Sequence, residues 1–312
     1  MVKVSVCIPA YNNPELFKKC LDSVLIQEFK DYEIIVSDDS TNNGVKKIVD
    51  SQKIPHLKYY YNSPALGSPQ NWNHAISKAS SKYIKILHHD DYFTDAGSLG
   101  KFVAALDNNP SADFAFCYSL INFKLKKSTY IHKQTKLQIK RLKIDINFLF
   151  FRNVIGNPSA VIFKNDKKMD FNKDYKWLVD VEFYIKYLNA HKQFVSVPEP
   201  LVTVVDGEAG QITQDITKNK KLVISENLNL FSKLYSKELH HKKSFLFFQE
   251  LFERNQIKSL KDMQKEFDVP KILSKFITDV FIDWPKSTLY KKAKKRILTS
   301  RYNKKIFKRE RF

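Results

Sequence analysis

The chain reads Tyr83-Ile84-Lys85-Ile86-Leu87-His88-His89-Asp90-Asp91-Tyr92 over ten consecutive positions, and this stretch is the most informative feature of the sequence. Its first half is β-branched and apolar, which is typical of a buried strand. The strand delivers two adjacent carboxylates, Asp90 and Asp91, to the point where a loop begins. Carboxylates there are well placed to hold Mg²⁺ or Mn²⁺ against a diphosphate, because both cations prefer oxygen ligands. The alternative is that the pair only caps a helix or fills a turn.

The segments before this stretch alternate between strand and helix patterns. Val2 to Pro9 predicts a strand that runs into a turn, and a helix is expected from Glu15 to about Gln27. The alternation continues with a strand at 33–36, a helix after Gly44, a strand at 57–61 and a helix at about 70–79. Strands alternating with helices imply right-handed βαβ units and a mostly parallel sheet.

Three polar clusters fall where predicted strands end. They are Tyr11-Asn12-Asn13, Asp38-Asp39 and the stretch from His88 to Asp91. Parallel sheets bind ligands at the carboxyl ends of their strands, so these clusters are expected to meet at one edge. The sequence therefore predicts a binding site at this edge.

These segments together resemble a known family, the family 2 glycosyltransferases with a GT-A fold. The stretch Ser5-Val6-Cys7-Ile8-Pro9-Ala10-Tyr11-Asn12 is similar to that family's first strand and its Pro-x-Tyr-Asn turn. The stretch from Glu33 to Asn43 is similar to its second strand with the paired aspartates. Asn62 to Ile76 resembles its "Asn…Gly…Asn…Ala-Ile" segment, and His88 to Asp91 stands where the family has its metal-binding Asp-x-Asp motif. The resemblance covers about the first two thirds of the chain.

The resemblance implies an α/β fold: a GT-A (nucleotide-diphospho-sugar transferase) Rossmann-like sheet, followed here by a C-terminal helical appendage. It also implies the residues that bind the donor, a sugar linked to a nucleoside diphosphate. Asp39 is similar to the family residue that accepts a hydrogen bond from the nucleotide base, which would favour uracil. The other donor-binding positions that the resemblance implies are Pro9, Ala10, Tyr11, Asp38, Gly67, Asn73, His89 and Asp90. For Asp38 and Asp39 the alternative is an Asx-turn that closes a strand.

The resemblance places a metal ion, Mn²⁺ or Mg²⁺, on Asp91 and Asp90, with His88 in the outer shell. Such a cation stabilises the negative charge that builds on a leaving diphosphate. This chain departs from the family in three places. Ser40 and Thr41 follow Asp39 where the family usually has Gly-Ser. Its metal-binding motif begins with His88 where the family commonly has aspartate, and no histidine occurs in the late loop between Leu201 and Thr213. The nearest polar residues of that loop are Asp206 and Glu208.

Transfer with inversion needs a carboxylate that takes a proton from the acceptor hydroxyl. The stretch Trp177-Leu178-Val179-Asp180-Val181-Glu182-Phe183-Tyr184 predicts the opening of a helix. The family places its base at the start of such a helix, and Asp180 holds that position. A place in the first helical turn also favours the ionised carboxylate. Glu182, which we expect to be solvated, is the second candidate, and the alternative for Asp180 is a plain N-terminal acidic residue.

Two further segments carry weaker predictions. Gly156 to Phe163 predicts a turn entering a strand, and it resembles the family segment beneath the acceptor site without a residue that forces a chemical role. Phe123 to Arg141 is polar and Lys-rich with little periodicity. It predicts a mobile surface loop, either a flap over the donor or a merely solvated segment.

Composition agrees with an intracellular enzyme. The 312 residues suit one catalytic domain with a smaller appendage. Three scattered cysteines in apolar contexts predict reduced, structural thiols. No apolar run reaches the ~20 residues that span a bilayer, and Val2 opens a strand rather than a signal peptide. We therefore expect a cytoplasmic protein, peripheral on the cytoplasmic face of the membrane.

The character of the sequence changes near Ile216, where Lys-rich helical patterns replace strand patterns. We expect a catalytic domain at 1–215 and a helical, strongly basic region at 216–312. Lys286 to Phe312 holds twelve Lys or Arg residues and one acid, and apolar residues recur four apart among them. Basic amphipathic helices bind anionic membranes, and this is the partner we expect for the segment. The alternatives are a solvated tail or nucleic-acid binding, and no specific nucleic acid is expected.

The sequence thus predicts a metal-dependent, inverting glycosyltransferase with a nucleotide-sugar donor, favouring a UDP-sugar. The expected acceptor is a cell-surface polysaccharide or a lipid-linked glycan. One alternative is a nucleotidyltransferase of similar architecture, which is disfavoured because no Gly-rich, Lys- or Arg-bearing loop follows the first strand. The other is a non-catalytic basic module that binds membrane or nucleic acid. That module would give Asp39, Asp91 and Asp180 no reason to occur together.

Overall fold

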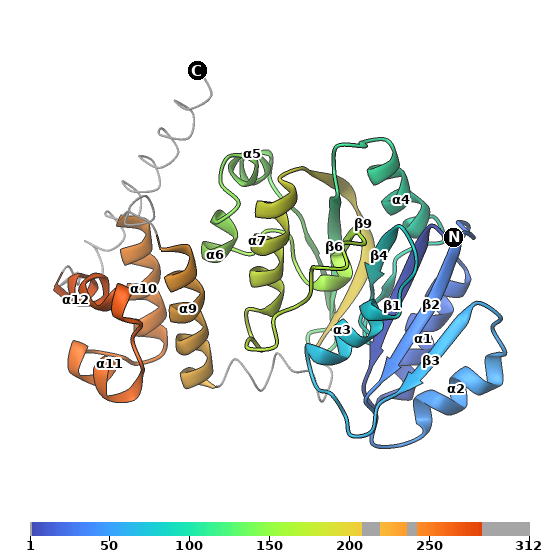
Figure 1. The fold of residues 1–312 in the computed structure, drawn as a ribbon, viewed down its shortest axis with the longest axis horizontal. Coiled ribbons are helices and arrows are strands. Elements are labelled where there is room, and N and C mark those ends of the chain that lie inside the picture. Colours follow the sequence, from blue (N-terminus) through green and yellow to red (C-terminus); the bar gives the residue numbers. More distant parts are fainter. Residues whose placement is uncertain (1, 208–218, 236–241, 283–312) are drawn as a thin grey trace. The chain divides into compact units, whose positions relative to one another are not determined.

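The structure is a computed structural model that describes residues 2–207, 219–235 and 242–282. The chain divides into two compact units (Figure 1). One comprises Met1–Lys140 and Asn153–Gln211, and the other comprises Arg141–Arg152 and Ile212–Phe312. The boundary expected after residue 215 stays a prediction. The basic segment Lys286–Phe312 and Glu208 of the late loop lie outside the described residues.

The first half of the larger unit is a parallel sheet with alternating helices. Its elements are β1 (Val4–Ala10), α1 (Pro14–Leu25), β2 (Tyr32–Asp38), α2 (Gly44–Gln52), β3 (Leu57–Tyr61), α3 (Gln70–Ser77) and β4 (Tyr83–Ile86). The strands β3, β2, β1 and β4 lie side by side in that order, all parallel (Figure 1). All seven residues of β1 and of β2 are buried, as expected for parallel strands covered on both faces. The predicted α/β class and its βαβ units are confirmed.

The first helix shows how local sequence sets these boundaries. The side chain of Asn13 caps α1 by accepting a hydrogen bond of 3.1 Å from the backbone N–H of Leu16. Pro14 occupies the first helical position, where its missing N–H costs nothing. The turn that ends β1 therefore starts α1 at once and leaves Tyr11 at the edge of the sheet.

The second half of the unit extends the same sheet with strands of mixed direction. Its elements are β5 (Tyr92–Phe93), α4 (Ser98–Asp107), β6 (Phe114–Phe123), β7 (Ser128–His132), η1 (Pro158–Ala160), β8 (Val161–Lys164), α7 (Val179–His191) and β9 (Phe194–Asp206). The sheet continues from β4 through β8, β6 and β9 to β5, and β7 pairs with β6. Because β8 is antiparallel to both β4 and β6, the strands β4 and β6 run in the same direction. Their carboxyl ends therefore lie at the same edge of the sheet.

The stretch from Phe123 to Arg141 differs from its prediction. It holds the last residue of β6, the strand β7 and most of helix α5 (Lys136–Ile144), so the predicted loop is wrong. Five register pairs between Ser119↔His132 and Phe123↔Ser128 join β6 and β7 into a hairpin. Most residues of β7 are exposed, so β7 shows none of the alternation that marks a half-buried strand.

The described part of the smaller unit is helical, as the sequence predicts. Its elements are α6 (Phe148–Phe151), α9 (Lys220–Leu234), α10 (Lys242–Arg254), α11 (Leu260–Glu266), η2 (Lys271–Leu273) and α12 (Ser274–Ile282). Aromatic rings form its core: Phe231 lies 5.4 Å from Phe150, 4.9 Å from Phe248 and 5.0 Å from Phe276 between ring centroids. Among the described residues, none of the helices combines the length and apolar composition that crossing a bilayer requires.

Candidate functional site

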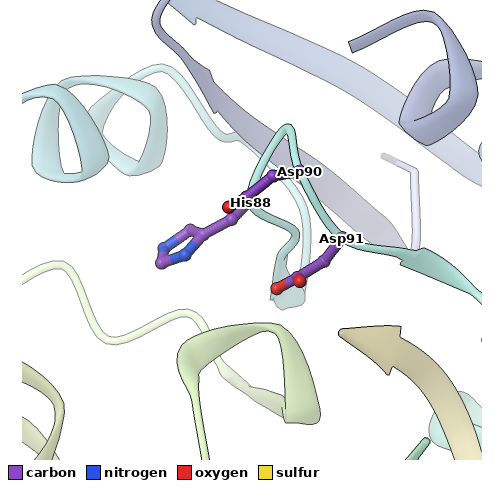
Figure 2. Close-up of side chains that lie close together, drawn as sticks. All are labelled: His88, Asp90 and Asp91. Carbon is purple, nitrogen blue, oxygen red and sulfur yellow. The ribbon is translucent and has the colours of Figure 1, made fainter. Parts of the chain in front are cut away.

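Three metal-ligating side chains gather on the turn that follows β4. His88, Asp90 and Asp91 each offer one ligand atom, and these atoms lie within 4.8 Å of one another. Figure 2 shows the side chains of His88 and Asp91 projecting from this one turn. The turn closes through a hydrogen bond of 2.9 Å from the N–H of Asp91 to the carbonyl of His88. Two carboxylates and one imidazole suit Mn²⁺ and other divalent cations of intermediate hardness.

Asp91 is the buried member of this cluster, with 2% of its surface exposed. Its carboxylate accepts a hydrogen bond of 2.8 Å from the side-chain amide of Asn157, and further hydrogen bonds from Ser159 and the backbone of Val205. Burial, followed by the negative charge of Asp90, raises the pKa of Asp91 well above its usual range. An uncompensated pair of carboxylates is therefore unfavourable here, and a divalent cation would restore the ionised form.

His88 joins the cluster more closely than an outer-shell residue would. Its Nε2 is buried and has no hydrogen-bond partner among the described residues. Burial lowers the pKa of His88 to about 4, so the imidazole is neutral at physiological pH. A neutral imidazole with a buried, unpartnered nitrogen is the form that coordinates a metal. The ring packs against Trp72 with 4.5 Å between ring centroids, which fixes its orientation.

A fully buried lysine lies beneath the cluster, and the sequence reading gave it no role. The ammonium of Lys85, on β4, donates hydrogen bonds to the backbone carbonyls of Ile86 and Ser159. It also lies 4.9 Å from the ring centroid of Phe102. Burial lowers the pKa of Lys85 to about 8. The sequence feature that could have identified Lys85 is its place as a charged residue inside an apolar strand, because lysines are almost never fully buried unless they are paired.

The two aspartates at the end of β2 are both held by protein groups. Asp39 accepts hydrogen bonds from the side chain of Asn62 at 2.8 Å and from the N–H groups of Leu66 and Gly67 at 3.1 and 2.7 Å. Gly67 has a φ of +73°, a conformation that favours glycine. Asp39 therefore fixes the loop after β3. A carboxylate has about four acceptor directions, so one remains for a ligand.

Asp38 makes the Asx-turn that was the alternative reading of this pair. It accepts hydrogen bonds from the N–H of Ser40 at 2.9 Å and from the hydroxyl of Tyr59 at 2.7 Å. These contacts give the Asp38 side chain a structural role. Its donor-binding role stays a prediction.

The remaining predicted donor residues divide between the edge of the sheet and its supports. Tyr11 is exposed at the end of β1, whereas Pro9 and Ala10 are buried in that strand. The side-chain NH₂ of Asn73 donates a hydrogen bond of 2.7 Å to the carbonyl of Phe171, and the side-chain oxygen of Asn73 accepts one of 2.8 Å from the N–H of Phe171. Both polar atoms of the Asn73 amide are therefore occupied. His89 is half-buried beside the cluster. The contacts of Asn73 are those of a structural residue.

Asp180 lies in the first turn of α7, as the sequence predicts. It accepts hydrogen bonds from the side-chain amide of Asn153 at 2.7 Å and from the N–H of Val181 at 2.8 Å. Burial raises the pKa of Asp180 to about 6, although these hydrogen bonds oppose the shift. A general base works best when its pKa lies near the operating pH, and Asp180 meets that condition.

Glu182, expected to be solvated, is buried. Its Oε1 is 3.5 Å from the amide of Asn172, and its Oε2 has no hydrogen-bond partner among the described residues. The prediction is wrong because most residues of α7 are buried, whereas the sequence pattern suggested a single covered face. Val181, Tyr184 and Leu188 of the same helix are also buried.

One short segment connects the two carboxylate sites, and the sequence reading gave it no chemical role. Asn153 donates to Asp180, and Asn157 donates to Asp91. The hydroxyl oxygen of Ser159 also accepts a hydrogen bond of 3.0 Å from the N–H of His88. Between these residues, the carbonyl of Gly156 accepts from Asn153 at 3.0 Å and from the hydroxyl of Tyr184 at 3.2 Å. The segment 153–159 thus sets the positions of the candidate base and the candidate metal ligands together.

The strand β9 contacts the cluster through its backbone. Val205, near the end of β9, donates to Asp91. Asp206 is exposed and its carbonyl accepts a hydrogen bond from the N–H of Lys124 at 3.0 Å. Glu208, the other polar residue predicted for this loop, lies outside the described residues.

Comparison with known sequences gives a family match that includes His88, Asp90 and Asp91 and ends before Asp180. The sequence family described as "Glycosyl transferase family 2" matches residues 5–165. The poly(ribitol-phosphate) beta-glucosyltransferase of Bacillus spizizenii is 35% identical over 217 residues, covering 66% of this chain and 33% of that protein. The GalNAc(5)-diNAcBac-PP-undecaprenol beta-1,3-glucosyltransferase of Campylobacter jejuni is 35% identical over 94 residues, covering 29% of this chain and 30% of that protein. This chain therefore spans about a third of each of these relatives.

Solved structures share the fold at low sequence identity. Staphylococcus aureus TarS residues 1–349, in complex with UDP-GlcNAc, superposes with a TM-score of 0.56 at 17% identity, covering 90% of this chain and 88% of that one. A mannosyltransferase from Pyrobaculum calidifontis, in complex with GDP-Man and Mn²⁺, gives a TM-score of 0.57 at 14% identity, covering 97% and 84%. These similarities confirm the predicted GT-A fold.

Proposed function

Because the chain belongs to glycosyl transferase family 2, we propose that it is a metal-dependent, inverting glycosyltransferase that uses a UDP-sugar. The observation that carries the proposal is the joint placement of its two carboxylate sites by the segment 153–159. That segment contacts Asp180 through Asn153 and Asp91 through Asn157. A transferase needs this coupling, because the leaving diphosphate and the attacking hydroxyl must be held in line.

The donor would bind at the carboxyl ends of β1, β2 and β4. Tyr11 offers an exposed ring there, and Asp39 keeps one acceptor direction for the N–H of a base. Gly67 and the loop that Asp39 fixes would frame the nucleotide. The TarS structure with UDP-GlcNAc has this fold, which supports a uridine donor here.

His88, Asp90 and Asp91 would hold the divalent cation. Their fit is supported by the unpartnered Nε2 of His88 and by the raised pKa of Asp91, which burial and the Asp90 charge cause. When bound, the ion supplies Lewis-acid stabilisation of the leaving diphosphate. Mn²⁺ accompanies GDP-Man in the Pyrobaculum mannosyltransferase of the same fold.

Asp180 would remove the proton from the acceptor hydroxyl as that oxygen attacks the sugar. Its pKa of about 6, raised by burial, leaves it ionised at neutral pH. Asn153 donates to Oδ2, and the backbone N–H groups of Val181 and Asp180 also donate to the carboxylate, so one of its roughly four acceptor directions would remain for the acceptor proton. The proton then rests on the Asp180 carboxyl until solvent removes it.

The acceptor is proposed to be a cell-surface polysaccharide or a lipid-linked glycan. Two relatives support this class: one is named for poly(ribitol-phosphate) and one for an undecaprenol-linked glycan. We further propose that the protein works at the cytoplasmic face of the membrane. The basic segment Lys286–Phe312 would contribute there by attraction to anionic lipids.

Thermal unfolding with UDP and Mn²⁺, each alone and both together, tests the donor site. Ligands that bind the folded state raise its stability by about 2.7 kcal/mol at a hundredfold excess over Kd. We expect a shift in Tm that needs both components and that Asp91→Asn removes. Asp50→Asn is the matched control, because Asp50 lies on α2 and forms an exposed ion pair with Lys46. A chain that responds to no nucleoside diphosphate with Mn²⁺ or Mg²⁺ would contradict the proposal, and a screen of nucleotide-sugars for hydrolysis would identify the donor.

A further inference from the structure

The β6–β7 hairpin carries an exposed, strongly basic tip that the proposed function does not use. Residues 114–140 contain six lysines and no aspartate or glutamate. Three of the lysines, Lys124, Lys126 and Lys127, lie in the turn itself, and every residue from 124 to 131 is exposed. The turn closes through a hydrogen bond of 3.3 Å from the N–H of Lys127 to the carbonyl of Lys124. The tip is therefore a concentrated positive charge on a defined backbone.

Apolar side chains stand among these cations. Leu125 is 81% exposed, Tyr130 is 54% exposed and Ile131 is 42% exposed. Single exposed apolar residues are ordinary on protein surfaces. Here, however, a leucine occupies the turn with a lysine directly before it and two directly after it. Apolar groups surrounded by cations are the pattern of segments that lie in the interface of an anionic membrane.

The hairpin lies along the edge of the sheet that carries the candidate site. Phe123 at the end of β6 pairs with Asp206 at the end of β9, next to the Val205 that donates to Asp91. At the other end of β7, the ring of His132 lies 3.4 Å from where a side chain on Gly156 would begin. Gly156 belongs to the segment that positions Asp180. The hairpin thus runs beside both carboxylate sites.

We propose that residues 124–131 dock on an anionic membrane surface, with Leu125 entering the headgroup region and the lysines facing lipid phosphates. A soluble polyanion would be bound by the lysines alone and would leave Leu125, Tyr130 and Ile131 in water. A membrane interface takes both kinds of group, so it matches more of what is exposed. The docked hairpin turns the catalytic edge toward the bilayer, and this orientation, but not the docking, rests on the proposed function.

A dye at the tip tests docking without any activity measurement. The three native cysteines, Cys7, Cys20 and Cys117, are buried, so Leu125→Cys provides one accessible thiol for an environment-sensitive label such as NBD. Ile26→Cys is the matched control: Ile26 is 61% exposed and apolar, and it follows α1 at the opposite edge of the sheet. With vesicles containing phosphatidylglycerol, we expect a blue shift and increased emission at position 125 and no change at position 26.

The shift at position 125 should disappear with phosphatidylcholine vesicles and weaken between 0.1 and 1 M salt, where the Debye length falls from about 10 to about 3 Å. The double substitution Lys126→Glu with Lys127→Glu should abolish it while donor hydrolysis in solution stays at the parent rate. A label at 125 that stays in water while the protein sediments with the vesicles would overturn the proposal and leave attachment to other segments. Equal responses at positions 26 and 125 would overturn it as unspecific adsorption. Soluble polyphosphate binding that the double variant loses, with no vesicle response at 125, would replace it with polyanion binding.

Discussion

The side-chain amide of Asn153 donates a hydrogen bond of 2.7 Å to the carboxylate of Asp180. Four residues later, the amide of Asn157 does the same for Asp91 at 2.8 Å. The two carboxylates belong to elements far apart in sequence, yet one short segment orients both. A shift of this segment would therefore displace the metal ligands and the base together, so substitution of its asparagines tests both sites.

Asn153→Ala should move the acid limb of the pH–rate profile upward. Burial raises the pKa of Asp180 to about 6, and the hydrogen bond from Asn153 opposes that shift, so its loss raises the pKa further. A base must be ionised, hence kcat/KM of the parent enzyme should fall below about pH 6, and that of the variant should fall at a higher pH. Kinetics with a soluble acceptor measure both limbs. An unchanged acid limb would show that Asp180 is not the base whose ionisation the pH–rate profile reports.

Asp180→Asn keeps the size of the side chain and loses its ability to accept a proton. General-base catalysis contributes about 10²–10⁴-fold, so kcat should fall by that amount. Donor affinity, measured by thermal shift with UDP and Mn²⁺, should persist because no donor residue changes. A loss below tenfold would direct attention to Glu182, whose buried carboxylate is the second candidate.

Asn157→Ala should weaken metal binding while leaving the ligands in place. Removal of a hydrogen-bond partner of a ligand costs about 10–100-fold in metal affinity. Mn²⁺ titration by electron paramagnetic resonance measures that loss directly. Asn109→Ala is the control, since Asn109 is exposed and its side chain donates to the helix carbonyl of Ala105. Equal Mn²⁺ affinity in Asn157→Ala and the parent protein would remove Asn157 from the support of the site.

The order of the strand-end clusters was predictable because it depends on local patterns. Apolar strands ending in Tyr11, Asp39 and Asp91 can be recognised from periodicity alone, and a parallel sheet brings such ends together. The partners of these residues were not predictable in the same way. Asn157 stands in a stretch whose sequence predicts only a turn entering a strand, and Asn153 belongs to no predicted motif. The contacts of both depend on how β8 and α7 pack against β4.

The two wrong predictions share a physical cause. Glu182 was expected in solvent because it is charged, and β7 was expected as a loop because its sequence is polar and lacks periodicity. Both expectations infer exposure and secondary structure from the local sequence alone. The helix α7 is covered on most of its surface, so Glu182 is buried despite its charge. The strand β7 is exposed along most of its length, so its sequence lacks the alternation of a half-buried strand. In each case tertiary position overrode the local pattern.

Glu33, at the amino end of β2, should make the stability of the fold sensitive to acid. Although burial raises the pKa of Glu33, hydrogen bonds from Lys58, Ser5 and Ser80 outweigh it and hold the pKa at about 2. Because this pKa lies below the unfolded value of about 4.3, the contribution is present above that pH and is lost as pH falls toward 2. Glu33→Gln should therefore lower Tm at pH 7 and flatten its fall between pH 5 and 3. Parallel melting curves that keep the parent slope would assign the acid sensitivity elsewhere.

Lys85→Met should lower both stability and catalysis. The substitution leaves the buried carbonyls of Ile86 and Ser159 without this donor, and an unpaired buried acceptor costs about 1–3 kcal/mol, so Tm at pH 7 should fall. Because burial lowers the pKa of Lys85 to about 8, removal of the buried charge offsets part of this loss, and the offset should shrink as pH rises above 8. The ammonium also holds the carbonyl of Ser159, whose hydroxyl contacts the cluster, so kcat should fall about 10–100-fold. A variant with a lowered Tm in calorimetry and the parent kcat in transfer assays would remove Lys85 from the support of the site.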